Sequence, residues 1–113
     1  MDNKPDVFLH HMLDAIALIE EFVIGFDYDQ FSNDERTKSA IIRQLEIVGE
    51  AGRRLESEFK KKYPNIPWKQ INGLRNILAH EYWDIDDRIV WKAATQSVLE
   101  LKMGIELIIE DLK

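Results

Sequence analysis

Cysteine is absent from this 113-residue chain, which excludes disulfides, thiolate nucleophiles and cysteine-based zinc or iron sites. A long hydrophobic run is absent as well. The most apolar stretch, residues 7–24, is interrupted by five polar side chains: His10, His11, Asp14, Glu20 and Glu21. That pattern fits neither a membrane span nor a signal peptide. The sequence therefore predicts a cytoplasmic protein that is neither exported nor embedded in a membrane.

The chain also lacks an excess of positive charge. It has 15 lysines and arginines against 21 aspartates and glutamates, for a formal charge of −6. A protein of this charge does not coat nucleic acid by bulk electrostatics, so any contact with RNA requires a local basic patch. The hydrophobic content of 45% and the length are typical of a globular protein with one domain, which we expect to span residues 1–113.

Apolar side chains recur at steps of three and four residues and predict helices. The first helix is expected from about Asp6 to about Ile24, with Gly25 ending it. Its predicted core stripe is Phe8, Met12, Ala15, Ile16, Ile19, Phe22 and Val23. A second apolar set lies off that stripe: Leu9, Leu13, Ala17 and Ile24. A helix that is apolar over more than half its circumference is central in its bundle or buried against a partner, and we favour a partner chain.

Residues 27–30 are predicted to be a short polar connection, followed by a second helix from Ser32 or Asn33 to the lysines at 60–62. Small residues such as Gly49 and Gly52 would let a neighbouring element approach it closely. Residues 67–71 are expected to form a single helical turn, and a third helix to begin at Leu74.

The last helix is expected from Asp86 or Asp87 to the C-terminus. Its predicted stripe is Val90, Ala94, Ser97, Leu101, Ile105, Ile108 and Leu112. No strand pattern is visible. The predicted fold class is all-α, an up-and-down four-helix bundle with a short extra helical turn.

Four chemically capable side chains gather between residues 75 and 82: Arg75, Asn76, His80 and Tyr82. At about 100° per helical residue, Arg75 and Tyr82 lie nearly above one another, whereas His80 lies about 140° away from Arg75. The three cannot share one face of one straight helix. Either the helix ends near His80, or a second copy of the protein completes the group.

These residue types suit RNA cleavage without a metal. An imidazole with a pKa of about 6.5 exchanges protons near neutral pH, so His80 suits a general base for the 2′-hydroxyl. A guanidinium binds phosphate oxygens and stays charged, so Arg75 suits stabilisation of the phosphorane. A symmetric dimer would place two His80 side chains across one groove, supplying a base and an acid.

Several motifs together resemble the HepT-like branch of the HEPN superfamily. They are Pro67-Trp68, Gly73-Leu74-Arg75-Asn76, Leu78-Ala79-His80-x-Tyr82, Asp86, Trp91 and Val48-Gly49-Glu50-Ala51. The resemblance implies a small HEPN-like helical homodimer without a cofactor or metal. It also implies a metal-independent RNase, the toxin of a type VII toxin–antitoxin system whose partner is a MntA-type nucleotidyltransferase antitoxin. Carried over by position, Arg75 and His80 are catalytic, Asn76 is supporting, and Tyr82 is the AMP acceptor.

Two other functions remain open. The chain can be a non-catalytic helical partner or substrate-binding subunit of a nucleotidyltransferase, or a helical dimer that binds nucleotide or RNA without cutting it. Without the resemblance, an Arg and a His near a helix end also serve as simple dipole caps.

Further charged residues have both functional and structural interpretations. Arg53, Arg54 and Lys69 line the RNA groove or are solvated surface residues. We expect His10 and His11 to lie on a surface or interface. Glu46 and Glu50 share a helix face and are expected to be solvated. Asp84, Asp86 and Asp87 are expected to cap helices.

Overall fold

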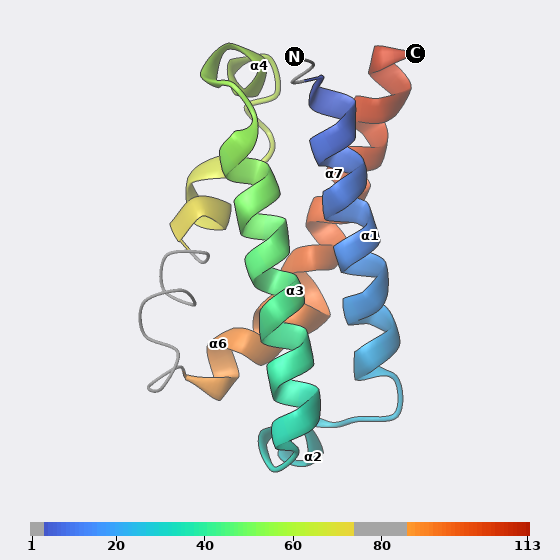
Figure 1. Cartoon of the computed structure of the whole chain (residues 1–113), viewed down its shortest axis with the longest axis vertical. Coiled ribbons are helices and arrows are strands. Elements are labelled where there is room, and N and C mark those ends of the chain that lie inside the picture. Colours follow the sequence, from blue (N-terminus) through green and yellow to red (C-terminus); the bar gives the residue numbers. More distant parts are fainter. Residues whose placement is uncertain (1–3, 74–85) are drawn as a thin grey trace.

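The computed structural model describes residues 4–73 and 86–113, and this part of the chain is helical without strands. The elements are α1 (Pro5–Val23), α2 (Tyr28–Ser32), α3 (Glu35–Arg54), α4 (Ser57–Lys61), a helical segment at 68–73, α6 (Asp87–Lys92), a π-helical turn η2 (Ala93–Ser97) and α7 (Val98–Leu112). α1, α3 and α7 lie roughly along the long axis of the molecule, and α6 crosses behind α3 at an angle to them (Figure 1). The all-α prediction is confirmed.

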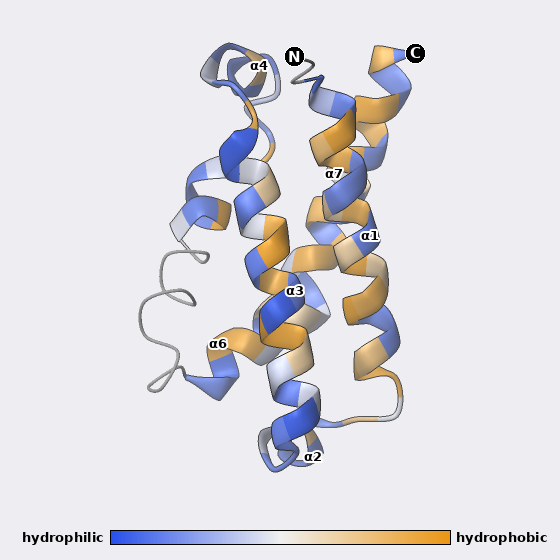
Figure 2. Ribbon diagram, in the orientation of Figure 1, coloured by the Kyte–Doolittle hydropathy of each residue, from blue (hydrophilic) through white to orange (hydrophobic). Residues whose placement is uncertain are grey.

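The core lies where α1 meets α3 and α7. Leu9, Ile16, Ile41 and Ile105 are completely buried there, and burial of each such side chain stabilises the fold by about 1.5–3 kcal/mol. Figure 2 shows how apolar residues recur along each long helix. No helix among the described residues is long and apolar enough to cross a membrane.

The interior of α1 differs in part from the prediction. Met12, Ala15, Ile16 and Ile19 are buried as expected. Leu9 also belongs to this core, and Leu13 packs against it. Their assignment to a face covered by a partner chain was therefore wrong. Ala17 and Ile24 are exposed.

The chain turns between α1 and α3 through a short helix that the sequence pattern did not predict. Gly25 takes a left-handed conformation with φ +82°, which ends α1 as expected. The predicted polar connection is instead the start of α2. The Asp27 carboxylate accepts from the Gln30 backbone N–H at 2.8 Å, and the Gln30 side chain accepts from the Asp27 N–H at 2.9 Å. This capping box stabilises a turn that buries Phe31.

The predicted second helix is divided in two. α3 begins at Glu35, where the Asp34 side chain accepts from the Thr37 N–H, so the cap lies later than the predicted Ser32 or Asn33. It ends at Arg54, because Leu55 adopts extended geometry with ψ 138°. Leu55 and Phe59 are both buried, so the periodic pattern continues across the break and conceals it.

The predicted last helix is continuous but contains the π-turn η2. The Val98 N–H bonds to the carbonyl of Ala93, five residues earlier. One extra residue in a turn rotates everything after it, so Val98 is buried and the predicted core residue Ser97 is exposed. Leu112, also predicted as core, is 46% exposed at the end of α7.

Candidate functional site

The four candidate residues Arg75, Asn76, His80 and Tyr82 lie outside the described residues, as does Asp84. The structure describes the elements on both sides of them. The helical segment at 68–73 leads into this part of the chain, and α6 follows it at Asp87. These two elements, the helical segment at 68–73 and α6, therefore flank the candidate residues in the chain.

The helical segment at 68–73 is fixed to α3 and to the loop before it. The Trp68 indole N–H donates to the Tyr63 carbonyl at 3.0 Å. A Cβ placed on Gly52 of α3 would lie 3.3 Å from Cγ2 of Ile71. That distance is shorter than an ordinary van der Waals contact, so a side chain at residue 52 would require Ile71 to shift. Gly52 is thus confirmed as a position of close approach.

A buried polar atom stands next to the candidate segment. The side-chain oxygen Oδ1 of Asn72 is buried and has no hydrogen-bond partner among the described residues. Such an unpaired acceptor costs about 1–3 kcal/mol in a protein interior. Asn72 is therefore a polar group that sequence reasoning missed, and its only sequence signal was its place before the Gly-Leu-Arg-Asn motif.

α6, which follows the undescribed residues, is held in place by charge and by aromatic packing. Asp86 caps α6 by accepting from the Arg88 N–H at 2.9 Å. Asp87 accepts from the Ser32 hydroxyl at 2.8 Å and from the Lys38 ammonium at 3.3 Å. These contacts confirm the expected capping role of Asp86 and show that Asp87 joins α6 to α2 and α3.

The Trp91 ring extends this attachment of α6. It stacks at a tilt on Phe31, with ring centroids 4.9 Å apart, and meets the Tyr28 ring edge-on at 6.4 Å. Such aromatic pairs add about 0.5–1.5 kcal/mol each beyond their buried area. Trp91 is thus explained by packing of α6 on α2.

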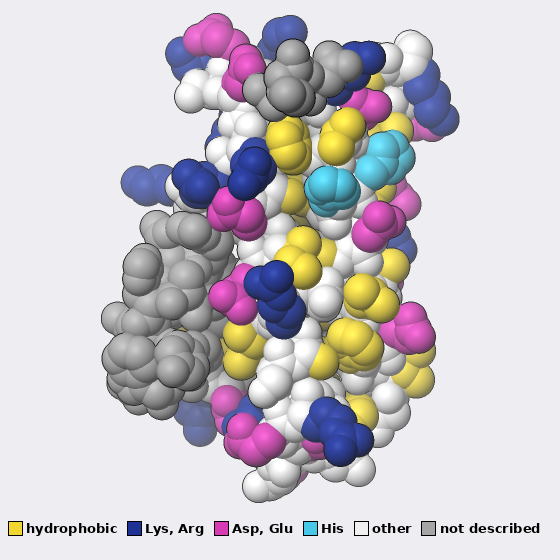
Figure 3. Space-filling view, viewed as in Figure 1, with side chains coloured by type: hydrophobic (Ala, Val, Ile, Leu, Met, Phe, Trp, Pro, Cys, Tyr) yellow, Lys and Arg dark blue, Asp and Glu magenta, His cyan; other side chains and the backbone are white. Residues whose placement is uncertain are grey.

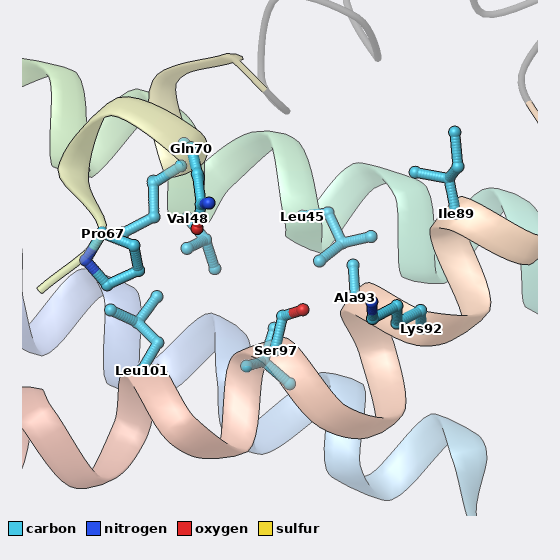
Figure 4. A pocket seen from close by; sticks show the side chains of 12 residues that line it. Leu45, Val48, Pro67, Gln70, Ile89, Lys92, Ala93, Ser97 and Leu101 are labelled. Atoms are coloured by element: carbon cyan, nitrogen blue, oxygen red, sulfur yellow. The ribbon is translucent and has the colours of Figure 1, made fainter.

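A hollow of about 340 Å³ separates the 68–73 segment from α6, η2 and α7, with α3 as its floor (Figure 4). Ile71 and Ile89, close to the two ends of the undescribed segment, both line it. The other lining side chains are mainly apolar, and the polar ones are Gln70, Lys92 and Ser97. Side chains near the border of each described range thus line one largely apolar hollow.

A basic cluster lies at the C-terminal end of α3. Arg53 and Arg54 are exposed and both pair with Glu50, at 3.1 Å and 3.5 Å. Partial burial and the nearby Arg53 charge lower the pKa of Lys60. Glu50 is therefore an ion-pair partner of two arginines, and the cluster keeps a positive excess. Lys69 is exposed.

The face formed by α1 and α3 carries mixed charges with apolar side chains between them (Figure 3). His10 and His11 are exposed on α1, as expected, and the His11 ring meets Phe8 edge-on at 6.4 Å. Among residues 4–73 and 86–113, no cluster of three or more His, Asp or Glu side chains has the geometry to hold a metal ion.

Comparison with known proteins gives the site its context. The family model described as Ribonuclease HepT-like matches residues 12–108, which include the whole candidate segment. The chain belongs to the HepT-like ribonuclease family. Two relatives illustrate the HepT-like match. A Methanocaldococcus jannaschii protein named "Putative RNase MJ1380" is 41% identical over 94% of this chain and 99% of its own length. A Thermococcus cleftensis protein named "Probable ribonuclease HepT" is 38% identical over 84% of this chain and 86% of its own. No solved structure matches this HepT-like chain.

Proposed function

We propose that this chain is a metal-independent endoribonuclease that acts as a homodimer in the cytoplasm. The observation that carries the proposal is the HepT-like match over residues 12–108, which contain the Arg75, His80 and Tyr82 pattern. The names of the relatives, which designate RNases, support the same substrate class.

In the proposed reaction, one His80 imidazole removes the proton of an RNA 2′-hydroxyl, and the 2′-oxygen attacks the adjacent phosphorus. Arg75 stabilises the charge on the phosphorane oxygens, with Asn76 as a supporting polar group. The bond from phosphorus to the 5′-oxygen then breaks. The His80 of the partner subunit, in its protonated form, gives its proton to that leaving oxygen. The products are a 2′,3′-cyclic phosphate and a free 5′-hydroxyl.

The proposal extends to control of the enzyme. A toxin of this type would be silenced by a MntA-type nucleotidyltransferase antitoxin that transfers AMP from ATP to the Tyr82 hydroxyl, with release of pyrophosphate. An added adenylate brings negative charge and bulk beside the groups that bind the RNA phosphate, so it would oppose substrate binding.

The test is cleavage of a defined RNA by the purified protein in EDTA. Wild type should cleave, and His80→Ala and Arg75→Ala should lose at least about a hundredfold in rate. The matched control is His11→Ala, which removes an exposed imidazole from α1 and should cleave like wild type. Equal cleavage by wild type and His80→Ala would refute the proposal.

A second arm examines the chemistry and the control step. An RNA with a 2′-deoxy group at the cleaved position should resist cleavage, and mass spectrometry should find the cyclic phosphate end. Incubation with a MntA-type antitoxin and ATP should add one AMP to wild type and none to Tyr82→Phe. Complex formation with the antitoxin in the absence of any RNA cleavage would instead favour a non-catalytic subunit of the nucleotidyltransferase.

A further inference from the structure

Three large apolar side chains project from the outer face of α7. Leu99, Met103 and Leu107 are 41%, 67% and 73% exposed. They follow one another at steps of four residues, so they form one continuous stripe along the helix. Single exposed apolar residues are common, whereas an aligned row marks an interaction site. We call these three residues, together with the neighbouring carboxylates of Glu100, Glu106 and Glu110, the α7 outer face.

The carboxylates of this face give it a negative charge. Glu106 is two helical turns from Leu99, and Glu110 is two turns from Met103, so both belong to the face with the stripe. Neither Glu100 nor Glu106 forms an ion pair with any residue in the described part of the chain. Glu110 pairs with Lys113 at the exposed end of the helix. Lys102 of α7 is paired with Glu20 of α1, so along the helix itself the charges of Glu100 and Glu106 favour a partner with positive charge.

The stripe ends at a hollow whose walls are fixed. Leu107 lines a hollow of about 340 Å³ together with the loop at 62–66. The Tyr63 hydroxyl donates to Asp111 at 2.7 Å, which ties this loop to α7. Ile66 is buried directly over Gly104, at a position where any Cβ would collide with it. The hollow is thus large enough for an apolar side chain of a partner, and it lies at the Leu107 end of the stripe.

We propose that the α7 outer face docks a basic amphipathic helix of another protein. Apolar side chains of that helix would pack on Leu99, Met103 and Leu107, with one of them in the hollow, and its lysines and arginines would face Glu100 and Glu106. This arrangement follows the helix-in-groove mode of recognition. A second copy of this chain would add further carboxylates to a face whose Glu100 and Glu106 have no ion-pair partner in the described part of the chain, and RNA would bring phosphates, so both are disfavoured by charge. The inference goes beyond the proposed nuclease function and does not depend on it.

The probe is a fluorescein-labelled synthetic helix of about 18 residues, with leucines at steps of four and seven and lysines on the flanks. Its binding to the full chain is followed by fluorescence anisotropy. Wild type should bind it at least about tenfold more tightly than a scrambled peptide of the same composition. Equal binding of both peptides would reduce the effect to bulk attraction between opposite charges and overturn the proposal.

Variants then test the face itself. Leu107→Glu should weaken binding of the patterned peptide by about tenfold or more. Ile24→Glu is the matched control, because Ile24 is 74% exposed on a different element, and it should bind like wild type. Glu106→Lys keeps every apolar contact and should weaken binding mainly at low salt. Unchanged binding in Leu107→Glu or Glu106→Lys would refute the docking site. Separation of associated copies by Leu107→Glu, seen by sedimentation, would assign the face to self-association instead.

Discussion

At the residue scale, the lack of a side chain at Gly104 lets Ile66, in the loop before Pro67, pack directly against the backbone of α7. Ile66 sits on the bare backbone of α7, where a Cβ on residue 104 would collide with its Cδ1 atom. Glycine in a helix interior costs about 1 kcal/mol relative to alanine. The fold tolerates that cost because the loop that carries Tyr63 and Ile66 is thereby held against α7.

We predict that Gly104→Ala lowers the free energy of unfolding by about 1–2 kcal/mol, because overpacking outweighs the gain in helix propensity. Ile66→Val removes the colliding atom, so the double variant should be more stable than the sum of the single changes predicts, with a coupling of about 1 kcal/mol or more. Urea unfolding of the four proteins measures this. If the changes in the free energy of unfolding of the two single variants simply add in the double variant, residues 104 and 66 are not in tight contact.

Lys38 is the residue whose charge joins α3 to α6. Its side chain is 16% exposed and pairs with Glu35 at 3.0 Å and with Asp87 at 3.3 Å. The hydrogen bond to Glu35, followed by the bond to Asp87, raises the pKa of Lys38 above its ordinary 10.5. A raised pKa means that the folded state holds the proton more tightly than the unfolded chain. The contribution to stability is thus complete below pH 10.5 and is lost as the pH rises through the raised value.

We therefore predict that Lys38→Met is less stable than wild type by about 1 kcal/mol at neutral pH, and that this difference shrinks above about pH 10.5. The comparison variant is Lys61→Met, which removes an exposed ion pair with Glu58 and should cost less than about 0.5 kcal/mol. Denaturant unfolding at several pH values measures both. A difference that stays constant to high pH would contradict the assigned charge contribution.

At the scale of elements, the π-turn η2 is the feature that sets the last helix in register. It gives one turn an extra residue, so that Val90 on α6 and Val98 on α7 both face the core. The Thr95 hydroxyl donates to the Trp91 carbonyl at 2.7 Å and satisfies an acceptor within this irregular stretch. A bulge of this kind is equivalent to a one-residue insertion in an α-helix.

The equivalence makes a prediction about deletions. Removing the exposed Gln96 should convert the π-turn into ordinary α-helix and leave both core faces in place, with a loss of about 2 kcal/mol or less. Removing the exposed Glu100 instead rotates the rest of α7 by about 100°, so Leu101 and Ile105 would leave the core and cooperative folding should fail. Circular dichroism and thermal unfolding distinguish the two. An equal loss of stability in both deletion variants would show that the π-turn is not equivalent to a one-residue insertion.

These elements also show what the sequence could predict. Long periodic segments gave α1, the start of α3 and the last helix to within a few residues, because burial of an apolar stripe dominates their stability, whereas the predicted second helix ran on past the end of α3 at Arg54. The short α2 was missed although its capping box is visible in Asp27 and Gln30, because five residues carry too little periodicity. The break at Leu55 and the π-turn leave the apolar spacing nearly unchanged, so no local pattern revealed them.

For the candidate site, sequence reasoning and structure contribute different parts. The roles of Arg75 and His80 rest on the family resemblance together with their chemistry, that of Tyr82 rests on the resemblance alone, and all three stay predictions. Gly52 was predicted from its size alone and is confirmed by its approach to Ile71. The Asn72 oxygen, which has no hydrogen-bond partner among the described residues, is buried by tertiary structure, which residue types along a chain do not report.

Over the whole molecule, an acidic protein is proposed to act on a polyanion, so the location of its charges matters more than their sum of −6. Partial burial, and after it the charge of Arg53 at the end of α3, lower the pKa of Lys60 in α4, so at least two cations lie near one another there. The acidic α7 outer face lies on a different helix. Two regions of opposite charge would let one attract RNA while the other attracts a basic protein partner.

The proposed dimer leads to a prediction about mixtures. If one catalytic cleft needs the His80 of both subunits, a heterodimer of wild type and His80→Ala holds one imidazole and cannot supply base and acid together. After subunit exchange in an equal mixture, RNase activity should fall to roughly a quarter of that of the same total amount of wild-type dimer, since random pairing gives about that share of intact clefts. Subunits with independent sites would give about half. Cleavage rates measured across a series of mixing ratios distinguish a quadratic from a linear dependence on the wild-type fraction, and a linear dependence would refute the shared cleft while leaving the assignment of His80 intact.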